Sequence, residues 1–376
     1  MEMCCCEECS ARNHWGRLEY LLWWTKGNDL PPLVTTGTTA GQGVLGASGT
    51  QILFGDDQVD NKSRSGLRAQ VGHWLDGCKD TGIQATYFGV FDDRDTGDFF
   101  AATTGPFESG TPILARPFFN NSPGVDAEDA QLISFPNTVD PTRSADGSIN
   151  ISSTSELHSG SVLLRQRYRE CNGNRVDLLV GCRYLRYREG VLFQKDLVST
   201  ATGGLIPQGT TFSFTDLFAV RNDFHGGELG VRSEFQRCYW TLELLAKVAL
   251  GNIQRTIDID GRAVTTTRGR TPPSSARGIL ALPTNMVHAT DNDFAALPEL
   301  GVHVTYEPRN SLQLLLGYSL VMLTDVARTG EHIDSVLNAI QFAGGTLVGP
   351  ARPTPQVGNV SDFWAHGLSF GILMER

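Results

Sequence analysis

Hydrophobic and polar residues alternate at every second position in about ten separate stretches of the chain. In residues 312–322, six apolar side chains alternate with smaller or polar ones such as Gln313, Gly317 and Ser319. In residues 242–250, five apolar side chains alternate with Glu243 and Lys247. A period of two indicates extended strands with one apolar face and one mixed or polar face. The pattern therefore predicts an all-β protein.

The lengths of the connections between these stretches carry further information. The expected strands are 15–24, 65–76, 81–92, 153–170, 175–189, 211–237, 239–259, 294–307, 311–327 and 363–374. Short connections follow the second, fourth, sixth and eighth strands, and longer ones follow the others. This asymmetry is typical of an antiparallel up-and-down outer-membrane β-barrel with short periplasmic turns and long external loops. We predict about ten strands, with twelve as the alternative count, and both termini on the periplasmic side; a soluble sandwich gives no reason for such alternation.

The chain divides into two parts on this interpretation. Residues 14–376 form a single outer-membrane barrel domain with long loops near 26–62, 93–151, 261–292 and 329–362, and residues 1–13 form a flexible Cys-rich N-terminal segment. The crowded cysteines at the start are expected to be free thiols or disulfides of an oxidising compartment, because they offer only half of a chelating zinc motif. The start MEMCCCEEC is not a signal peptide. An exported barrel needs one, so the true start is expected upstream or the signal has been removed.

Composition excludes some classes of protein. Charged residues make up 19% of the chain and the net charge is −10, which argues against a nucleic-acid binder. No apolar run approaches 18 residues, so a transmembrane helix is not expected. The expected partners are the lipid bilayer of the bacterial outer membrane, the barrel-assembly machinery and small solutes; the oligomeric state stays open.

Charged residues on the polar faces of the strands are expected to point into the barrel lumen. A lysine or arginine at bilayer depth on the lipid side costs about 2–4 kcal/mol. The lumen-facing candidates are Arg17, Glu19, Arg68, Arg165, Arg167, Arg169, Asp177, Arg183, Glu228, Arg232, Glu234, Glu243, Lys247, Glu299 and His303. A barrel of about ten strands is narrow, so charges of mixed sign favour pairing across the lumen over a wide aqueous pore. Arg165, Arg167 and Arg169 form a same-face basic ladder that would favour anions if the lumen conducts.

Aromatic residues near the predicted strand ends are expected to form interfacial girdles at the two membrane surfaces. They are Tyr20, Trp23, Trp24, Tyr239, Trp240, Phe363 and Trp364. A sugar-binding platform is the alternative, which nothing in the sequence requires.

No motif predicts catalytic, cofactor-binding or metal-binding residues. The text GQGVLG at 41–46 lacks the strand and helix of a dinucleotide site. Four aspartates between 92 and 98 lack the spacing of an EF-hand, so a solvated acidic loop is favoured over a weak cation site. Glu331, His332 and Asp334 could suggest acid–base work at the rim, but no recognisable motif supports it, and the polarity of an exposed loop is the favoured account. A rim-located hydrolase is therefore the second alternative function.

The chain resembles the planctomycete β-barrel porin family BBP7 over residues 14–373. The motifs that carry the resemblance are EYLLWWTKG (19–27), PPLVTTG (31–37), GVLGASGTQILFG (43–55), ARPFFN (115–120), GCRYLRYREGV (181–191), FAVRNDFHGGELG (218–230), KVALGN (247–252) and GYSLVMLTDVARTGEHID (317–334). The resemblance implies a porin-type outer-membrane barrel and supplies no catalytic residues to carry over to this chain. We therefore expect a non-enzymatic barrel for passive passage of small solutes or ions. The first alternative is a surface barrel with a closed lumen whose long external loops bind a partner.

Overall fold

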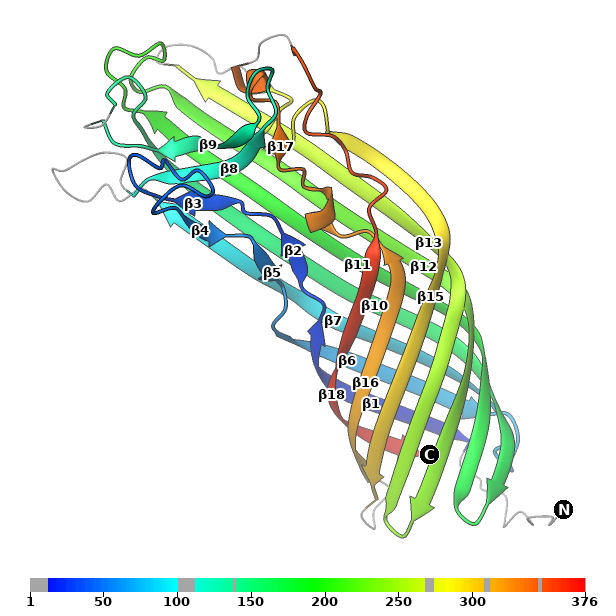
Figure 1. Ribbon diagram of the computed structural model, residues 1–376. Helices are drawn as coiled ribbons and strands as arrows, with labels where there is room; N and C mark the ends of the chain where they lie inside the picture. Colours follow the sequence, from blue (N-terminus) through cyan, green and yellow to red (C-terminus); the bar gives the residue numbers. More distant parts are fainter. Residues whose placement is uncertain are drawn as a thin grey trace.

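The computed structural model describes residues 13–100, 112–137, 140–267, 274–307, 312–343 and 347–375. Ten long antiparallel strands form a closed barrel in the order β12-β11-β10-β7-β6-β1-β18-β16-β15-β13, and a β12–β13 pairing completes the ring (Figure 1). The strands are β1 (His14–Thr25), β6 (Ser63–Trp74), β7 (Thr81–Phe100), β10 (Ala145–Cys171), β11 (Asn174–Ser199), β12 (Thr211–Arg237), β13 (Trp240–Thr266), β15 (Val287–Tyr306), β16 (Leu312–Val326) and β18 (Ser361–Glu375). The predicted ten-stranded antiparallel barrel is confirmed.

Short turns and long connections lie at opposite ends of the barrel. Strands β6 and β7, β10 and β11, β12 and β13, and β15 and β16 are joined by short turns. In one of them, Asn172 and Gly173 have φ values of 51° and 75°, the left-handed conformation of tight hairpin turns that Asn-Gly readily adopts. Strand β18 ends beside these turns (Figure 1). We call this end periplasmic and the opposite end external.

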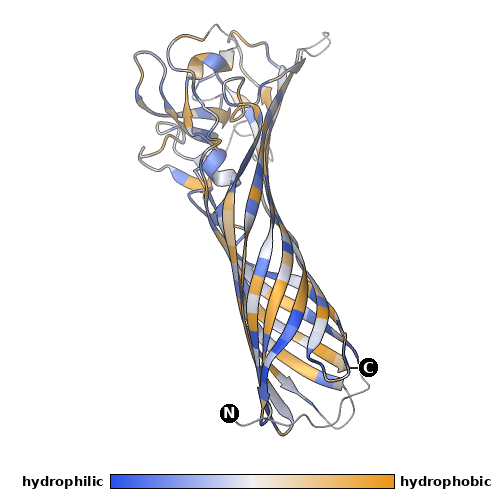
Figure 2. Cartoon of the chain, turned by 90° about the vertical axis from the view of Figure 1, so that its right-hand side faces the viewer, coloured by the Kyte–Doolittle hydropathy of each residue, from blue (hydrophilic) through white to orange (hydrophobic). Residues whose placement is uncertain are grey.

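The outward face of the periplasmic half of the barrel is apolar. On β13, the outward side chains from Trp240 to Leu250 are apolar, and the next one, Asn252, is polar. On β11 the same change falls between Tyr184 and Arg186. Figure 2 shows orange residues recurring across this lower wall. A stretch of about ten residues at ~3.3 Å per residue and a tilt of about 45° covers roughly 25 Å, the height of the lipid-facing band of an outer-membrane barrel.

The strands extend well beyond this apolar belt at the external end. Strand β7 continues to Phe100, β10 already begins at Ala145, and β8 and β9 lie between them, so the expected irregular loop 93–151 was too long. Beyond the belt the polarity of the wall is reversed. Ile149 and Ile151 point inward and are fully buried, while the alternate residues Ser148, Asn150 and Ser152 are half-exposed on the outward face. The stripe of outward apolar residues, which marked the predicted strands, therefore ends before the strands do.

The long connections fold into one external cap, formed by the described residues of 26–62, 112–144, 200–210, 274–286 and 327–360. Its elements are β2 (Asn28–Leu30), β3 (Val34–Thr36), β4 (Gln51–Phe54), β5 (Asp57–Val59), β8 (Leu114–Asn120), β9 (Ala127–Ser134), β14 (Ser274–Ser275), η1 (Thr329–His332), β17 (Val336–Leu337) and η2 (Ala339–Ala343). Strands β17, β8, β3 and β4 form one small sheet, extended by β9, and β2 pairs with β5.

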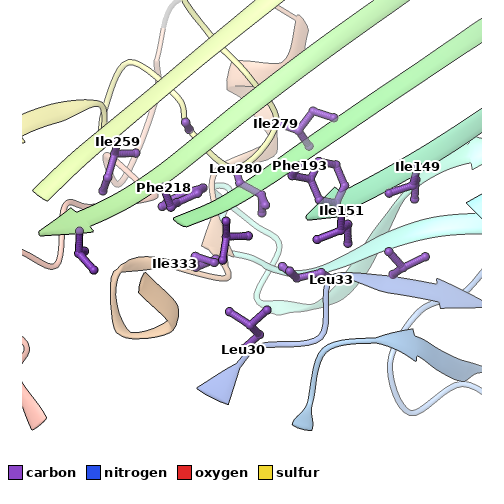
Figure 3. Packing of buried hydrophobic residues seen from close by; sticks show 14 of the residues in the cluster. Leu30, Leu33, Ile149, Ile151, Phe193, Phe218, Ile259, Ile279, Leu280 and Ile333 are labelled. Atoms are coloured by element: carbon purple, nitrogen blue, oxygen red, sulfur yellow. The ribbon is translucent and has the colours of Figure 1, made fainter. Parts of the chain in front are cut away.

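The cap packs against the inward face of the external half of the barrel. Its hydrophobic core joins cap residues such as Leu33, Leu280 and Ile333 to wall residues such as Phe193 and Phe218 (Figure 3). The long loops therefore cover the external mouth of the barrel. Among the described residues, no helix is long and apolar enough to cross a membrane.

Candidate functional site: the filled barrel interior

Charged side chains fill the periplasmic half of the barrel interior, and we call them the ionic network. Its members are Arg17, Glu19, Arg68, Arg165, Arg175, Asp177, Arg183, Glu228, Arg232, Glu234, Glu243, Lys247, Glu299 and His303. They come from β1, β6, β10, β11, β12, β13 and β15. Both signs are present, and each member lies within ion-pair distance of another.

Several of these ion pairs cross the lumen. Arg17 on β1 donates to Glu243 on β13 over 3.1 Å, although three strands separate β1 from β13 around the ring. Arg68 on β6 lies 3.9 Å from Glu299 on β15, again with three strands between them. Contacts of this kind are possible only if the side chains meet at the centre of the barrel. The lumen at this level is therefore occupied by its own side chains.

Glu299 binds three cationic side chains of the network. It pairs with Arg183 from β11, with Lys247 over 3.0 Å and with Arg68. Arg183 and Lys247 also share Glu228, over 2.9 and 3.2 Å. Aromatic rings also stabilise charge in the network. The guanidinium of Arg68, for example, lies 5.3 Å from the ring centre of Trp23.

A second group of the network lies nearer the periplasmic turns. Asp177 binds both Arg165 and Arg175, the latter over 2.8 Å. Both guanidinium groups lie over the ring of Trp74, at 4.8 and 4.6 Å from its centre. Glu234 links Arg165 to the rest of the network through Arg232. The indole of Trp74 therefore forms part of the floor of the barrel.

The two remaining members of the expected basic ladder lie differently from Arg165. Arg167 is half-buried and pairs with Asp80 and Glu170 at the periplasmic rim. Arg169 is exposed. A register shift between residues 167 and 169 explains the difference, because such a bulge changes which face of the strand the next side chain takes. The structure therefore shows no ladder of three arginines inside the lumen.

An apolar layer lies above the ionic network. It consists of Leu21, Trp23, Phe88, Val90, Leu157, Leu185, Tyr187, Phe224, Ala249, Ile253, Ala295, Leu297, Val321, Leu323, Val326, Phe363 and Ala365. Every barrel strand except β6 contributes to this layer. Trp23 and Phe363, which we expected in an interfacial girdle, are buried here because they occupy inward positions of β1 and β18.

A latch holds the loop after β16 above the apolar layer. The guanidinium of Arg328 donates to both carboxylate oxygens of Glu189 on β11, over 2.9 and 3.0 Å, and to the carbonyl of Gly27 over 2.9 Å. The hydroxyl of Tyr187 donates to the same carboxylate over 2.5 Å. Asn222 and the backbone of Ala327 form a reciprocal pair of hydrogen bonds. The loop is thereby tied to β11 and β12 inside the barrel mouth.

Three charged residues lie in the core region of the external cap. The carboxylate of Asp216 accepts the backbone N–H groups of Ile279, Leu280 and Ala281 over 2.8–3.2 Å. Arg116 and Lys195 are almost fully buried, and no guanidinium nitrogen of Arg116 has a hydrogen-bond partner among the described residues. Instead, Arg116 lies over the rings of two cap phenylalanines and Lys195 over one wall phenylalanine.

These groups, like the latch, were not among the sequence-predicted site residues. Lys195 lies in a part of β11 beyond the predicted strand end at 189, so the alternation did not assign it to the interior. Asp216 was inside a predicted strand, yet its inward position depended on the cap that covers it. The sequence contains one trace of the Asp216 site, which is the glycine at position 278 in the run RGILAL (277–282). Only glycine fits there, because a Cβ would lie 1.6 Å from a carboxylate oxygen of Asp216.

Burial gives the cap a distinct pH dependence. It lowers the pKa of Lys195 from 10.5 to about 7, with Arg116 adding to the effect and Asp216 opposing it. The unfolded chain then binds more protons between pH 7 and 10.5, so the free energy of unfolding rises with pH in that window, by up to about 1.4 kcal/mol per pH unit. Burial raises the pKa of Asp216 to about 6. Its contribution to the free energy of unfolding therefore falls as pH rises from 3.8 to 6.

We therefore expect the urea midpoint to be higher at pH 9 than at pH 7. In Lys195→Met the rise above pH 7 should disappear, since this variant has no ammonium to discharge. Urea titrations of both proteins at pH 7, 8 and 9 test this. Parallel pH profiles would contradict the assignment to Lys195.

The remaining aromatic candidates lie on the outer wall. Tyr20 is exposed and its hydroxyl lies 2.7 Å from that of Ser65. Trp24 and Trp364 are half-buried at the external edge of the apolar belt, on either side of His366. Tyr239 and Trp240 are exposed at a periplasmic turn, where the ring of Trp240 contacts that of Tyr306 at a tilt, with ring centres 4.8 Å apart. Aromatic side chains therefore occur at both edges of the belt.

The rim residues do not form a linked acid–base set. His332 is buried, and its Nδ1 lies 2.7 Å from the carbonyl of Gln356. Asp334 accepts from Arg352 over 3.0 Å and from the backbone of Thr354 over 2.9 Å. Both side chains hold the loop before β18 in place. No group of three or more potential metal ligands occurs among the described residues.

The cysteines of the described chain divide into bonded and free. Cys78 forms a disulfide, whereas Cys171, Cys182 and Cys238 are free. The N-terminal cysteine cluster lies outside the described residues, as do the side chains of three of the four aspartates considered as a cation site.

A closed ten-stranded barrel with an apolar outer belt and a charged interior defines an outer-membrane β-barrel protein of bacteria. The chain belongs to the family described as "Putative beta barrel porin-7 (BBP7)", whose model matches residues 15–375. The family expected from the sequence motifs is confirmed. The expected planctomycete origin stays a prediction.

Several solved outer-membrane proteins match the chain at very low sequence identity. The outer membrane protease OmpT from Escherichia coli is 6% identical over 97% of each chain, with a TM-score of 0.41. A major outer membrane protein from Thermus thermophilus is 9% identical over 96% of this chain and 99% of that one, with a TM-score of 0.23. A Pseudomonas aeruginosa FadL homologue is 8% identical over 96% and 89%, with a TM-score of 0.21. No curated protein matches the sequence.

Proposed function

We propose that this protein is a non-enzymatic outer-membrane barrel with a closed lumen, which holds its external cap at the cell surface for contact with a partner. The observation that carries the proposal is the apolar layer across the lumen, between the ionic network and the cap. An ion that crosses such a layer loses its hydration without finding polar groups in return, and hydrophobic constrictions of pores stop conduction for this reason.

The cap offers a cleft for such a partner. A cavity of about 710 Å³ lies between β9, the 200–210 connection and η2. Phe118 and Phe342 contribute apolar surface, Asp129 and Arg143 contribute charges, and Leu205 on the cleft wall is fully exposed. The cleft thus has a mixed lining of apolar and polar side chains, and polar groups beside apolar surface can fix the orientation of a bound partner.

Passive passage of small solutes is the second candidate, and the family description favours it. In that function the cap and its latch would have to move away from the barrel mouth. The charges of the ionic network would then select which ions pass. Under either function, the protein's partners would include the barrel-assembly machinery and the lipid bilayer.

Conductance of the refolded protein in a planar bilayer distinguishes the two functions. We expect no discrete current steps from protein whose fold is verified by heat-modifiable migration in gels. Discrete steps whose reversal potential changes in Arg165→Gln would contradict the closed lumen and establish passage.

A further inference from the structure

The bilayer-facing wall contains an apolar groove. A cavity of about 640 Å³ with almost entirely apolar walls lies across β6, β7, β10, β11 and β12. Gly160 lies at its centre, directly between Tyr87 on one neighbouring strand and Tyr184 on the other. The groove exists because glycine has no side chain there, while the two tyrosines stand on either side.

Charged residues begin directly beyond the groove on the external side. Moving two residues along each strand, His158, Arg186 and Asp223 are neighbours in register. Arg186 and Arg221 both bind Asp223, over 2.7 and 2.9 Å. The hydroxyl of Tyr184 donates to the same carboxylate over 2.5 Å. Asp223 thereby links Tyr184, at the rim of the apolar groove, to two arginines.

A third arginine faces a second hollow just above. Arg188 lies beside Arg221 in register, and its ion pair among the described residues is a 3.9 Å contact with Glu156. Both arginines line a cavity of about 520 Å³ on this wall, whose far side holds the bonded pair Asp258 and His288. More than a third of the side-chain surface of each of the three arginines, Arg186, Arg188 and Arg221, is exposed. Three guanidinium groups, together with His158 and His288, thus lie among three carboxylates, those of Glu156, Asp223 and Asp258, at the external edge of the belt.

We propose that this wall binds one lipid of the external leaflet. Its anionic, phosphate-bearing head group lies at Arg186, Arg188 and Arg221, and one acyl chain fills the groove at Gly160. The groove opens toward the hydrocarbon region, where acyl chains are the material in contact with it. Guanidinium groups bind phosphate by paired hydrogen bonds, and tyrosines are favoured at this depth.

The thiol of Cys182 gives a direct measurement of occupancy. Cys182 is exposed, free and part of the groove wall, whereas free Cys238 lies in a periplasmic turn. We expect phosphatidylglycerol, added to protein in mild detergent, to slow alkylation of Cys182 by N-ethylmaleimide about tenfold without slowing that of Cys238. Phosphatidylcholine with the same chains should protect much less, since its head group carries no net charge.

Two variants assign the two halves of the site. Gly160→Leu should abolish the protection, and its side chain fits, because a Cβ there meets only a backbone oxygen at 3.9 Å. Ala246→Leu, on the outward face of β13 away from the groove, is the matched control and should behave like the wild type. Arg188→Gln should weaken phosphatidylglycerol binding about fivefold, corresponding to ~1 kcal/mol per basic residue.

Native mass spectrometry of the same samples should show one retained phosphatidylglycerol in the wild type and in Ala246→Leu. Equal protection by both lipids, or protection that Gly160→Leu leaves intact, would overturn the proposal. Loss of protection in Ala246→Leu would also overturn it, because the effect would then not belong to the groove.

Discussion

Replacing Glu299 by alanine is expected to destabilise the barrel by about 3–5 kcal/mol, the usual cost of breaking a buried ion pair from one side. The variant leaves Arg183 and Lys247 to share Glu228, and leaves Glu19 as the one carboxylate paired with Arg68 among the described residues. All these side chains are almost fully buried, so water does not replace the lost carboxylate. The measurement is urea unfolding in lipid vesicles, followed by tryptophan fluorescence.

Two further variants make this result specific. Glu307→Ala removes an exposed glutamate at the end of the same strand and should change the free energy of unfolding by no more than about 0.5 kcal/mol. Adding Lys247→Met to Glu299→Ala removes one of the two cations that are left to share Glu228, and should restore part of the loss. A Glu299→Ala midpoint equal to that of Glu307→Ala would mean that the network contributes no stability.

The sequence was most informative where the chain meets lipid. On a lipid-facing wall every second residue must be apolar, so the pattern of residues such as Leu242, Leu244 and Val248 follows from the membrane and needs no tertiary information. The strand number, the alternation of turn lengths and the outward belt could therefore be predicted. The strand ends at the external side could not, because beyond the belt the apolar residues face inward and cover a core made by distant loops.

The same difference explains which site residues could be found. A glutamate such as Glu243, alternating with leucines, is assigned to the interior by the strand pattern alone. Asp216 and Arg328 have partners more than 60 residues away, in loops whose path no local pattern specifies. Arg169 was assigned to the interior by the strand pattern and lies outside it. One bulge in the strand changes the face that its side chain takes, and the sequence pattern does not show this bulge.

Replacing Asp216 by alanine is expected to release the 274–286 segment from the barrel mouth. Its carboxylate is the acceptor for the three successive N–H groups at 279–281, all buried in the core of the cap. Each buried donor left without an acceptor costs about 1–3 kcal/mol. The buried cations Arg116 and Lys195 would also lose the carboxylate that favours their charged forms. Three such donors make a local loss of at least about 3 kcal/mol, which favours opening of this segment while the rest of the barrel stays folded.

Limited proteolysis of the folded protein in detergent measures this release directly. Asp216→Ala should be cleaved in the 274–286 segment at least tenfold faster than the wild type, while the barrel keeps its heat-modifiable migration. Asp260→Ala, which removes an exposed aspartate from neighbouring β13, should be cleaved at the wild-type rate. Asp216→Asn keeps one acceptor oxygen and should lie between them. If Asp216→Ala resists cleavage as well as Asp260→Ala does, hydrophobic packing of Ile279 and Leu280 alone holds the segment, and the carboxylate is not its anchor.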